Sequence, residues 1–148
     1  MSRSVETHPV SFAHIVRGKQ VILTMAGSTV QAGFPAPAGD AKERIDIAAY
    51  LVRRPESTYF IRVAGDSMTG AGIFDGDMLV VDRSLEPSSG DIVIAVINGE
   101  FTVKRFYCNG SKIELRAENP RFKKIVLSEG MEMEIWGVVT SAVKSFRS

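Results

Sequence analysis

Cysteine is almost absent from this chain, since Cys108 is the only one among 148 residues. A single cysteine excludes an internal disulfide, and disulfides are the usual reinforcement of small secreted domains. The composition therefore fits a reducing compartment, and we expect a cytoplasmic protein.

Long apolar runs are missing as well. No stretch approaches the roughly 18 consecutive apolar residues that cross a bilayer, so we expect no membrane association. The segment 20–28 is mildly apolar and ends in small residues. Its apolar run is short, however, and the polar stretch before it has few basic residues, unlike a signal peptide. We expect a strand at this place.

An excess of one charge is missing too, and histidine is rare. The chain has 18 Lys and Arg residues against 17 Asp and Glu, a net charge of +1, whereas proteins that bind nucleic acid through its phosphates are usually basic. We therefore expect no direct sequence-specific DNA binding. The two histidines, His8 and His14, lack metal-ligand spacing, so we expect neither a metal nor another cofactor.

Short strand patterns dominate the second half of the chain and predict a mostly β domain, of sandwich or barrel-like architecture. The apolar run Ile92–Ile97 ends at Asn98-Gly99, the strongest short signal for a β-hairpin. This turn pairs the run with a strand at Phe101–Tyr107. Further strands are predicted at 59–63, 78–81, 112–116 and 135–143.

One short helix is predicted at 44–52, with Asp46 as its N-cap and Pro55 beyond its end. Before it, two prolines and two glycines within 33–40 predict an irregular linker. We therefore expect three parts in the chain. They are a flexible N-terminal arm over 1–32, a Pro/Gly-rich linker over 33–44 and a folded domain over 45–148.

A candidate nucleophile lies in the folded domain. Ser67 follows Gly65 closely, and this glycine permits a tight turn from which Asp66 or Ser67 can begin a short helix. The backbone N–H groups of Ser67 and Met68 at such a start would serve as an oxyanion hole.

A candidate base lies in the strand after the hairpin. A serine hydroxyl becomes a nucleophile only when a base takes its proton, and both histidines lie far outside this domain. Lys104 sits among Phe101, Val103 and Phe106. An ordinary lysine has a pKa of about 10.4, so only on the order of 0.1% is neutral near pH 7. Burial lowers that pKa by several units, and the residues therefore indicate a Ser-Lys hydrolase.

A non-catalytic interpretation stays open at this point. A Gly-Asp-Ser-Met string is more often a turn or a helix cap, and a lysine within a strand usually lies on an exposed face. The two-residue period of a strand places Lys104 with Thr102 and Phe106, opposite Val103 and Arg105. This period does not decide whether Lys104 is buried. In the non-catalytic interpretation Ser67 is a cap, Lys104 is structural and the chain is an interaction module of the same fold.

In order and spacing, four segments resemble the LexA/UmuD family of self-cleaving serine peptidases, and its UmuD-type SOS mutagenesis proteins in particular. The resemblance runs from about Gly33 to Phe146. The segments are 32–38, 57–68, 72–82 and 90–104.

The resemblance implies that Ser67 is the nucleophile, that Lys104 is the general base and that Ala32-Gly33 is the bond cut. Cleavage would remove residues 1–32 and leave 33–148 as the active product. The resemblance also implies stimulation by a RecA filament on single-stranded DNA and a homodimeric product. That product would be the accessory subunit of an error-prone translesion DNA polymerase, beside a UmuC-type subunit.

Two other kinds of protein share parts of this pattern. LexA-type repressors carry a DNA-binding domain before the cleavage site, whereas residues 1–32 show no helix-turn-helix pattern. We therefore expect the mutagenesis-protein branch rather than a repressor C-terminal domain. Bacterial signal peptidases also use Ser-Lys chemistry, but they need a membrane anchor. We expect none in this sequence, which disfavours that interpretation.

Overall fold

The structure is a computed structural model that describes residues 4–14, 22–26 and 41–147. The chain divides into two compact units. One is Val16–Arg53, and the other joins Met1–Ile15 to Arg54–Ser148. The Ala32-Gly33 bond and the predicted irregular segment 33–40 lie outside the described residues.

The smaller unit contains a two-stranded antiparallel sheet and the only α-helix among the described residues. β2 (Ile22–Ala26) pairs with β3 (Ala41–Asp46), and the strand expected within 20–28 is confirmed. α1 (Ile47–Leu51) begins after Asp46, whose side chain accepts a hydrogen bond of 3.1 Å from the N–H of Ala49. The predicted N-cap is confirmed, but the helix prediction for 44–46 was wrong because these residues continue β3.

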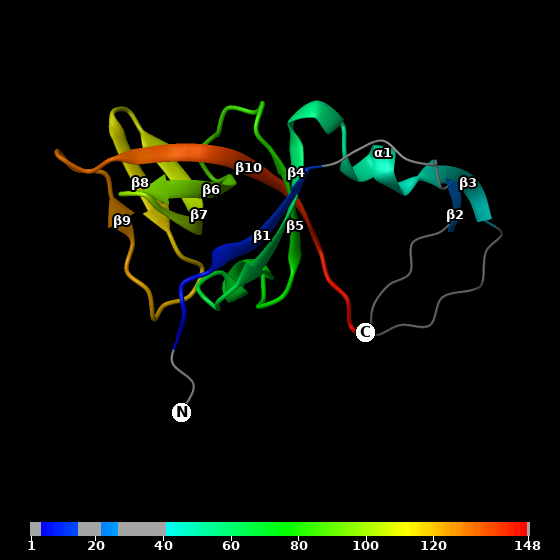
Figure 1. Ribbon diagram of the computed structural model, residues 1–148, viewed down its shortest axis with the longest axis horizontal. Coiled ribbons are helices and arrows are strands. Elements are labelled where there is room, and N and C mark those ends of the chain that lie inside the picture. Colours follow the sequence, from blue (N-terminus) through cyan, green and yellow to red (C-terminus); the bar gives the residue numbers. More distant parts are fainter. Residues whose placement is uncertain (1–3, 15–21, 27–40, 148) are drawn as a thin grey trace. The chain divides into compact units, whose positions relative to one another are not determined.

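The larger unit is an eight-stranded sheet in which all neighbouring strands are antiparallel (Figure 1). Its spatial order is β1-β4-β5-β10-β6-β7-β8-β9, and the prediction of a mostly β fold is confirmed. The strands are β1 (His8–His14), β4 (Thr58–Ala64), β5 (Met78–Asp82), β6 (Ile92–Ile97), β7 (Glu100–Asn109), β8 (Lys112–Arg116), β9 (Ile125–Val126) and β10 (Met133–Val143). Two 3₁₀ turns, Pro55–Ser57 and Thr69–Ala71, flank β4.

The predicted hairpin joins β6 to β7. Asn98 has φ +48° and Gly99 has φ +84°, the left-handed pair that a two-residue type I′ turn requires. This turn sets the register of the two strands and places Lys104 opposite Val93.

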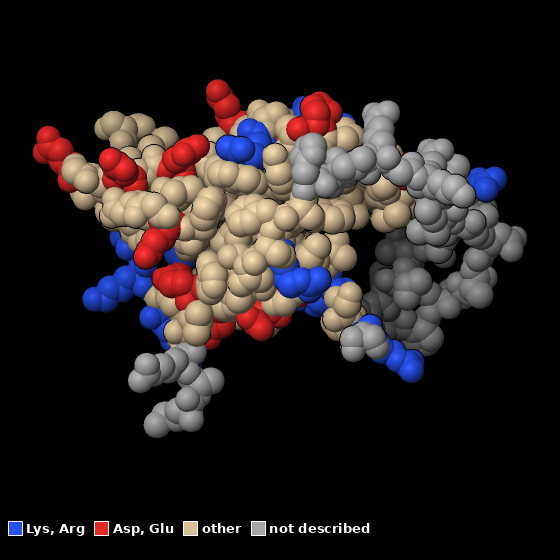
Figure 2. Space-filling view, viewed as in Figure 1, with Lys and Arg blue, Asp and Glu red and all other residues tan. Residues whose placement is uncertain are grey.

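Charged side chains of both signs are scattered over the face shown in Figure 2, around a largely uncharged centre. This distribution agrees with the near-zero net charge of the whole chain. Among the residues that the structure describes, no helix is long and apolar enough to cross a membrane.

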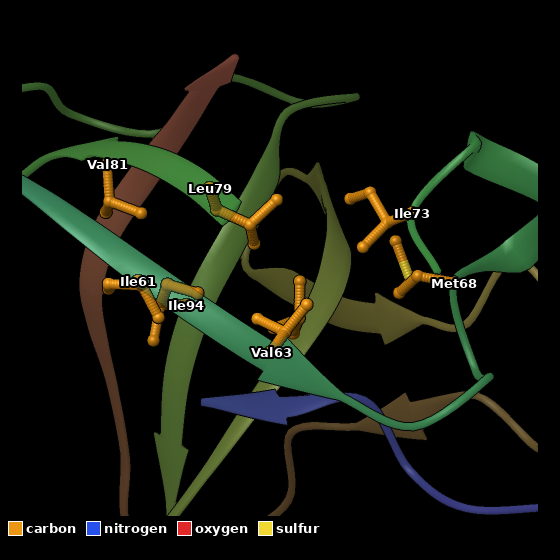
Figure 3. Packing of buried hydrophobic residues seen from close by; sticks show 8 residues of the cluster. Ile61, Val63, Met68, Ile73, Leu79, Val81 and Ile94 are labelled. Atoms are coloured by element: carbon orange, nitrogen blue, oxygen red, sulfur yellow. The ribbon is translucent and has the colours of Figure 1, made fainter. Parts of the chain in front are cut away.

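Apolar side chains on both sides of the catalytic candidates form the core. One cluster consists of Ile61, Val63, Met68, Ile73, Leu79, Val81, Ile94 and Val103 (Figure 3). Met68 directly follows Ser67, and Val103 directly precedes Lys104. Since packed side chains occupy few rotamers, the core fixes the backbone beside both residues. A second cluster lies farther along the sheet and includes Val93, Ala95, Phe106, Leu115 and Val138.

One edge strand of the sheet, β1, comes from the predicted arm. It pairs with β4 from His8 opposite Ala64 to His14 opposite Tyr59. Aromatic contacts hold it as well, since the ring of Phe12 lies 5.3 Å from that of Trp136 and 5.4 Å from that of Phe101. At least part of the arm is therefore built into the sheet.

Three cations surround one buried carboxylate on β8. Glu114 accepts hydrogen bonds from Arg116 and Lys124 and forms an ion pair with Lys112. The hydrogen bond from Arg116, assisted by the two lysines, lowers the pKa of Glu114 from 4.5 to about 2. The ionised form is thus stabilised in the folded state.

Glu114→Gln is expected to weaken the loss of stability in acid. A carboxyl group with a lowered pKa stabilises the fold above its unfolded value of 4.5, and that contribution disappears as the pH falls from 4.5 toward 2. Urea unfolding at several pH values should therefore show a shallower decline for Glu114→Gln over this window. Glu129→Gln, at an exposed position, is the control and should follow the parent.

Candidate active site

The candidate nucleophile lies in the turn that follows β4. Gly65 has φ +106°, a conformation that favours glycine, and it turns the chain so that Ser67 and Met68 are fully buried. The prediction that Asp66 or Ser67 begins a helix was wrong. The 3₁₀ turn begins at Thr69 with Met68 as its cap, because Ser67 continues the turn from β4.

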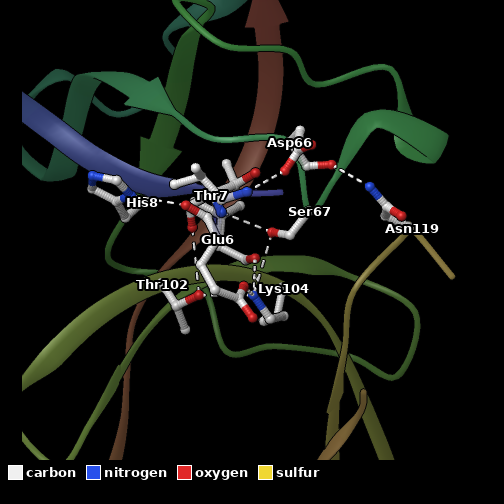
Figure 4. A network of polar contacts seen from close by, with 10 residues as sticks. Glu6, Thr7, His8, Asp66, Ser67, Thr102, Lys104 and Asn119 are labelled. Atoms are coloured by element: carbon white, nitrogen blue, oxygen red, sulfur yellow. Dashed lines mark hydrogen bonds and ion pairs between the residues drawn. The ribbon is translucent and has the colours of Figure 1, made fainter. Parts of the chain in front are cut away.

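The candidate base approaches this serine from β7. Nζ of Lys104 lies 3.4 Å from Oγ of Ser67 (Figure 4), and the Lys104 side chain has no exposed surface. Val103 on the opposite face of β7 is equally buried. Both faces of the strand are covered, which is why a two-residue period could not decide the burial of the lysine.

Three further groups surround the Lys104 ammonium. Its Nζ donates to Oγ1 of Thr102 at 2.9 Å and to the carbonyl of Val103 at 3.3 Å, and it forms an ion pair with the half-exposed carboxylate of Glu6. Burial lowers the pKa of Lys104 below its usual 10.5, and Glu6 opposes this shift. The amine is thus easier to deprotonate than an exposed lysine.

The nucleophile turn is tied to the loop after β8. The N–H of Glu118 donates to the carbonyl of Ser67 at 2.9 Å, and the N–H of Gly70 donates to the carbonyl of Glu118 at 2.7 Å. The Asn119 side-chain amide donates to the carbonyl of Asp66 at 2.8 Å. These bonds hold the carbonyl side of the turn on both sides of Ser67.

The N–H side of the same turn is available. Within the described part of the chain, neither the N–H of Ser67 nor that of Met68 donates a hydrogen bond. Adjacent unengaged N–H groups beside a nucleophile are the donors that an oxyanion hole requires. The oxyanion hole expected at Ser67 and Met68 stays a prediction.

The N-terminal segment reaches this site, which the sequence did not indicate. The N–H of Thr7 donates to Oγ of Ser67 at 2.8 Å (Figure 4), and Thr7 itself is fully buried. Sequence reasoning also missed the contacts of Glu6, Glu118 and Asn119, for which no local pattern exists. Thr102 was placed on the face of Lys104 by the strand period, and that was the available signal.

The described residues contain no group of three or more His, Cys, Asp or Glu side chains that could hold a metal ion. The structure thus brings together Ser67 and Lys104, with two unengaged N–H groups beside them. It does not place Ala32 and Gly33, which lie outside the described residues.

Comparison with known proteins identifies the family. The sequence profile described as Peptidase S24-like matches residues 23–140. The chain is 45% identical to Protein SamA of Salmonella typhimurium over 118 residues, which is 79% of this chain and 81% of SamA. It is 47% identical to Protein MucA of Escherichia coli over 116 residues, 77% of this chain and 79% of MucA. It is also 38% identical to the LexA repressor of Syntrophotalea carbinolica over 126 residues, 85% of this chain and 61% of the repressor. The chain therefore belongs to the Peptidase S24-like family, the LexA/UmuD family of serine peptidases whose motifs its sequence resembles.

Proposed function

We propose that this chain is a self-cleaving serine endopeptidase that cuts its own Ala32-Gly33 bond with a Ser67–Lys104 dyad. The observation that carries the proposal is the 3.4 Å approach of Nζ to Oγ at a lysine without exposed surface. A buried amine beside a serine hydroxyl is the arrangement that activates a serine without histidine.

The first chemical step needs neutral Lys104. The free amine accepts the hydroxyl proton of Ser67 while Oγ attacks the carbonyl carbon of Ala32. Negative charge develops on the carbonyl oxygen, and the N–H groups of Ser67 and Met68 stabilise it. The lowered pKa of Lys104 supports this role, because it raises the neutral fraction near physiological pH.

The second step breaks the bond. Protonated Lys104 returns its proton to the departing amine of Gly33, and Ala32 remains attached to Oγ as an ester. Water then hydrolyses the ester, with Lys104 again accepting a proton. The products are residues 1–32 and residues 33–148, and Ser67 is regenerated.

The relatives suggest a setting for this reaction. We infer that a RecA filament on single-stranded DNA stimulates the cut, and that residues 33–148 act as a homodimer in the cytoplasm. The processed form would serve an error-prone translesion polymerase together with a UmuC-type subunit. Similarity to SamA and MucA supports the inference, as does the S24-like match.

Self-cleavage is expected in the parent chain and not in Ser67→Ala. The rate should rise about tenfold for each pH unit below the lowered pKa of Lys104, because only the neutral amine acts as a base. Intact mass spectrometry of the purified chain between about pH 7 and 10 measures both the rate and the bond cut.

Ser128→Ala, at an exposed position, is the matched control and should cleave like the parent. Cleavage can require the activating filament. If the chain stays whole at every pH, the assay is therefore repeated with RecA, single-stranded DNA and nucleotide added. An intact chain in that mixture, or normal cleavage of Ser67→Ala, would contradict the proposal. The chain would then be an interaction module in which Ser67 and Lys104 are structural.

A further inference from the structure

We propose that residues 5–7 are an internal inhibitor of the peptidase: they fill the Ser67–Lys104 site as an extended peptide and must leave before the site can cut. The inference rests on the self-cleavage proposed above. It concerns regulation of that site by a segment 25 or more residues before the bond that is cut.

The segment binds through its backbone, as an extended substrate would. The N–H of Asp66 donates to the carbonyl of Val5 at 2.7 Å, and the N–H of Val103 donates to the carbonyl of Thr7 at 2.9 Å. The N–H of Val5 donates to the side chain of Asp66. Peptides that add a strand to a sheet edge are held by this kind of main-chain bond.

The fit leaves no room for a second peptide. A Cβ added to Gly65 would lie 2.2 Å from the carbonyl oxygen of Glu6 and 2.7 Å from Cα of Thr7. Backbone therefore lies directly on backbone at this glycine. Thr7 and Ser67 both have no exposed surface, so a segment carrying the scissile bond reaches Oγ only after residues 5–7 have moved away.

The bound segment holds the site in an unreactive state. Oγ of Ser67 accepts the N–H of Thr7 at 2.8 Å and faces the Lys104 ammonium at 3.4 Å. When Lys104 is protonated, Oγ therefore faces N–H donors on two sides, and no other group among the described residues accepts its own hydrogen. Lys104 is also paired with Glu6, which favours the protonated amine over the base. An N–H group, rather than a carbonyl carbon, faces the nucleophile.

Residues 5–7 bind the site imperfectly, and their binding is therefore reversible. Oγ1 of Thr7 is buried and has no hydrogen-bond partner within the described part of the chain, and a buried unpaired hydroxyl is unfavourable. The carboxylate of Glu6 is 49% exposed, so water competes for its ion pair. A segment held this way can open while the sheet stays folded.

Two substitutions of Thr7 are expected to change the cleavage rate in opposite directions. Thr7→Pro removes the N–H that bonds to Ser67 and should speed self-cleavage at least tenfold, because the rate follows the fraction of open sites. Thr7→Val removes the unpaired hydroxyl at nearly constant shape and should slow it severalfold. Neither change replaces a charged residue, so any effect on the ionisation of Lys104 comes through movement of Glu6 with the segment.

Amide hydrogen exchange measures whether residues 5–7 occupy the site, and it does not depend on cleavage. At about pH 6, where a smaller fraction of Lys104 is neutral than at pH 7–10 and cutting is slower, the Val103 amide should be protected in the parent because it donates to Thr7. Thr7→Pro should remove that protection and Thr7→Val should increase it. Glu129→Gln serves as the control in both assays and should match the parent.

Each outcome decides the matter. Equal cleavage rates in the parent and Thr7→Pro, or a Val103 amide that Thr7→Pro leaves unchanged, would overturn the inhibitor while the peptidase stands. If no variant loses mass at any pH or with RecA and single-stranded DNA, the peptidase itself fails, and the inhibition falls with it. Faster cutting by Thr7→Pro and slower cutting by Thr7→Val, with matching exchange, establish the inhibitor.

Discussion

Lys104→Met should stop self-cleavage and at the same time make the folded chain more stable. Loss of a general base slows a reaction by about 10²–10⁴-fold, so cleavage should fall at least a hundredfold below the parent rate. The same substitution removes an amine without exposed surface and fills its place with an apolar side chain of similar length. Because Glu6, the ion-pair partner that stays behind, is half exposed and remains solvated, removal of the buried amine is expected to stabilise the fold by about 1 kcal/mol.

The stability gain of Lys104→Met could come from removal of the buried amine or from better packing. The pH dependence of the gain separates these two causes. Burial lowers the pKa of Lys104 in the folded state, so the unfolded chain binds a proton that the folded chain does not. Parent stability therefore rises as the pH increases from the lowered value toward 10.5. The advantage of Lys104→Met should be largest below this window and shrink within it. Urea unfolding measures the difference.

Lys123→Met is the control, because Lys123 is exposed in the loop after β8. It should change neither the cleavage rate nor the free energy of unfolding by more than about 0.5 kcal/mol. Cleavage by Lys104→Met at the parent rate would remove the lysine from the mechanism. A Lys104→Met chain that is less stable than the parent would mean that its ion pair with Glu6 outweighs the burial of the amine.

Gly70→Ala is expected to reduce self-cleavage about a hundredfold through the backbone alone. A Cβ at residue 70 would lie 2.5 Å from the carbonyl oxygen of Glu118, and the loop must move to relieve that contact. The N–H of Glu118 donates to the carbonyl of Ser67, so movement of the loop also displaces Ser67. A displacement of about 1 Å in a reacting group costs about 10²-fold in rate.

Gly130→Ala tests whether glycine replacement by itself explains such a loss. Gly130 has φ +85° and no atom within 4 Å of an added Cβ, so this change introduces backbone strain without a clash, at an exposed turn position. It should lower stability by about 1 kcal/mol and leave the cleavage rate near that of the parent. If Gly70→Ala cuts as fast as Gly130→Ala, the loop after β8 does not position the serine.

Local signals in the sequence were sufficient for most of the sheet. Asn98-Gly99 predicted the β6–β7 hairpin because two left-handed residues in succession permit few other structures. β1 has no comparable signal. It forms because residues 8–14 pair with β4, about fifty positions later in the chain. Local propensity does not predict pairing between segments so far apart in the sequence.

The site was predicted in part for the same reason. Ser67 and Lys104 carry recognisable chemistry on recognisable elements, and the structure brings them together. Of the two residues that hold the nucleophile turn, Glu118 acts through its backbone N–H and carbonyl, which every residue has. Asn119 acts through its side-chain amide on the carbonyl of Asp66, a contact that depends on the loop being brought beside the turn by the fold.

Trp136 is the only tryptophan in the chain, and its indole is enclosed by Phe12 of β1, by Tyr59 and by the guanidinium of Arg83. Phe12 belongs to the part of the chain that a cut after Ala32 would release. If the proposed cut releases β1, one aromatic wall of the indole is replaced by water, and the emission of Trp136 is expected to shift to longer wavelength. Tryptophan fluorescence would then follow the proposed processing in real time, without a label and without separation of the fragments.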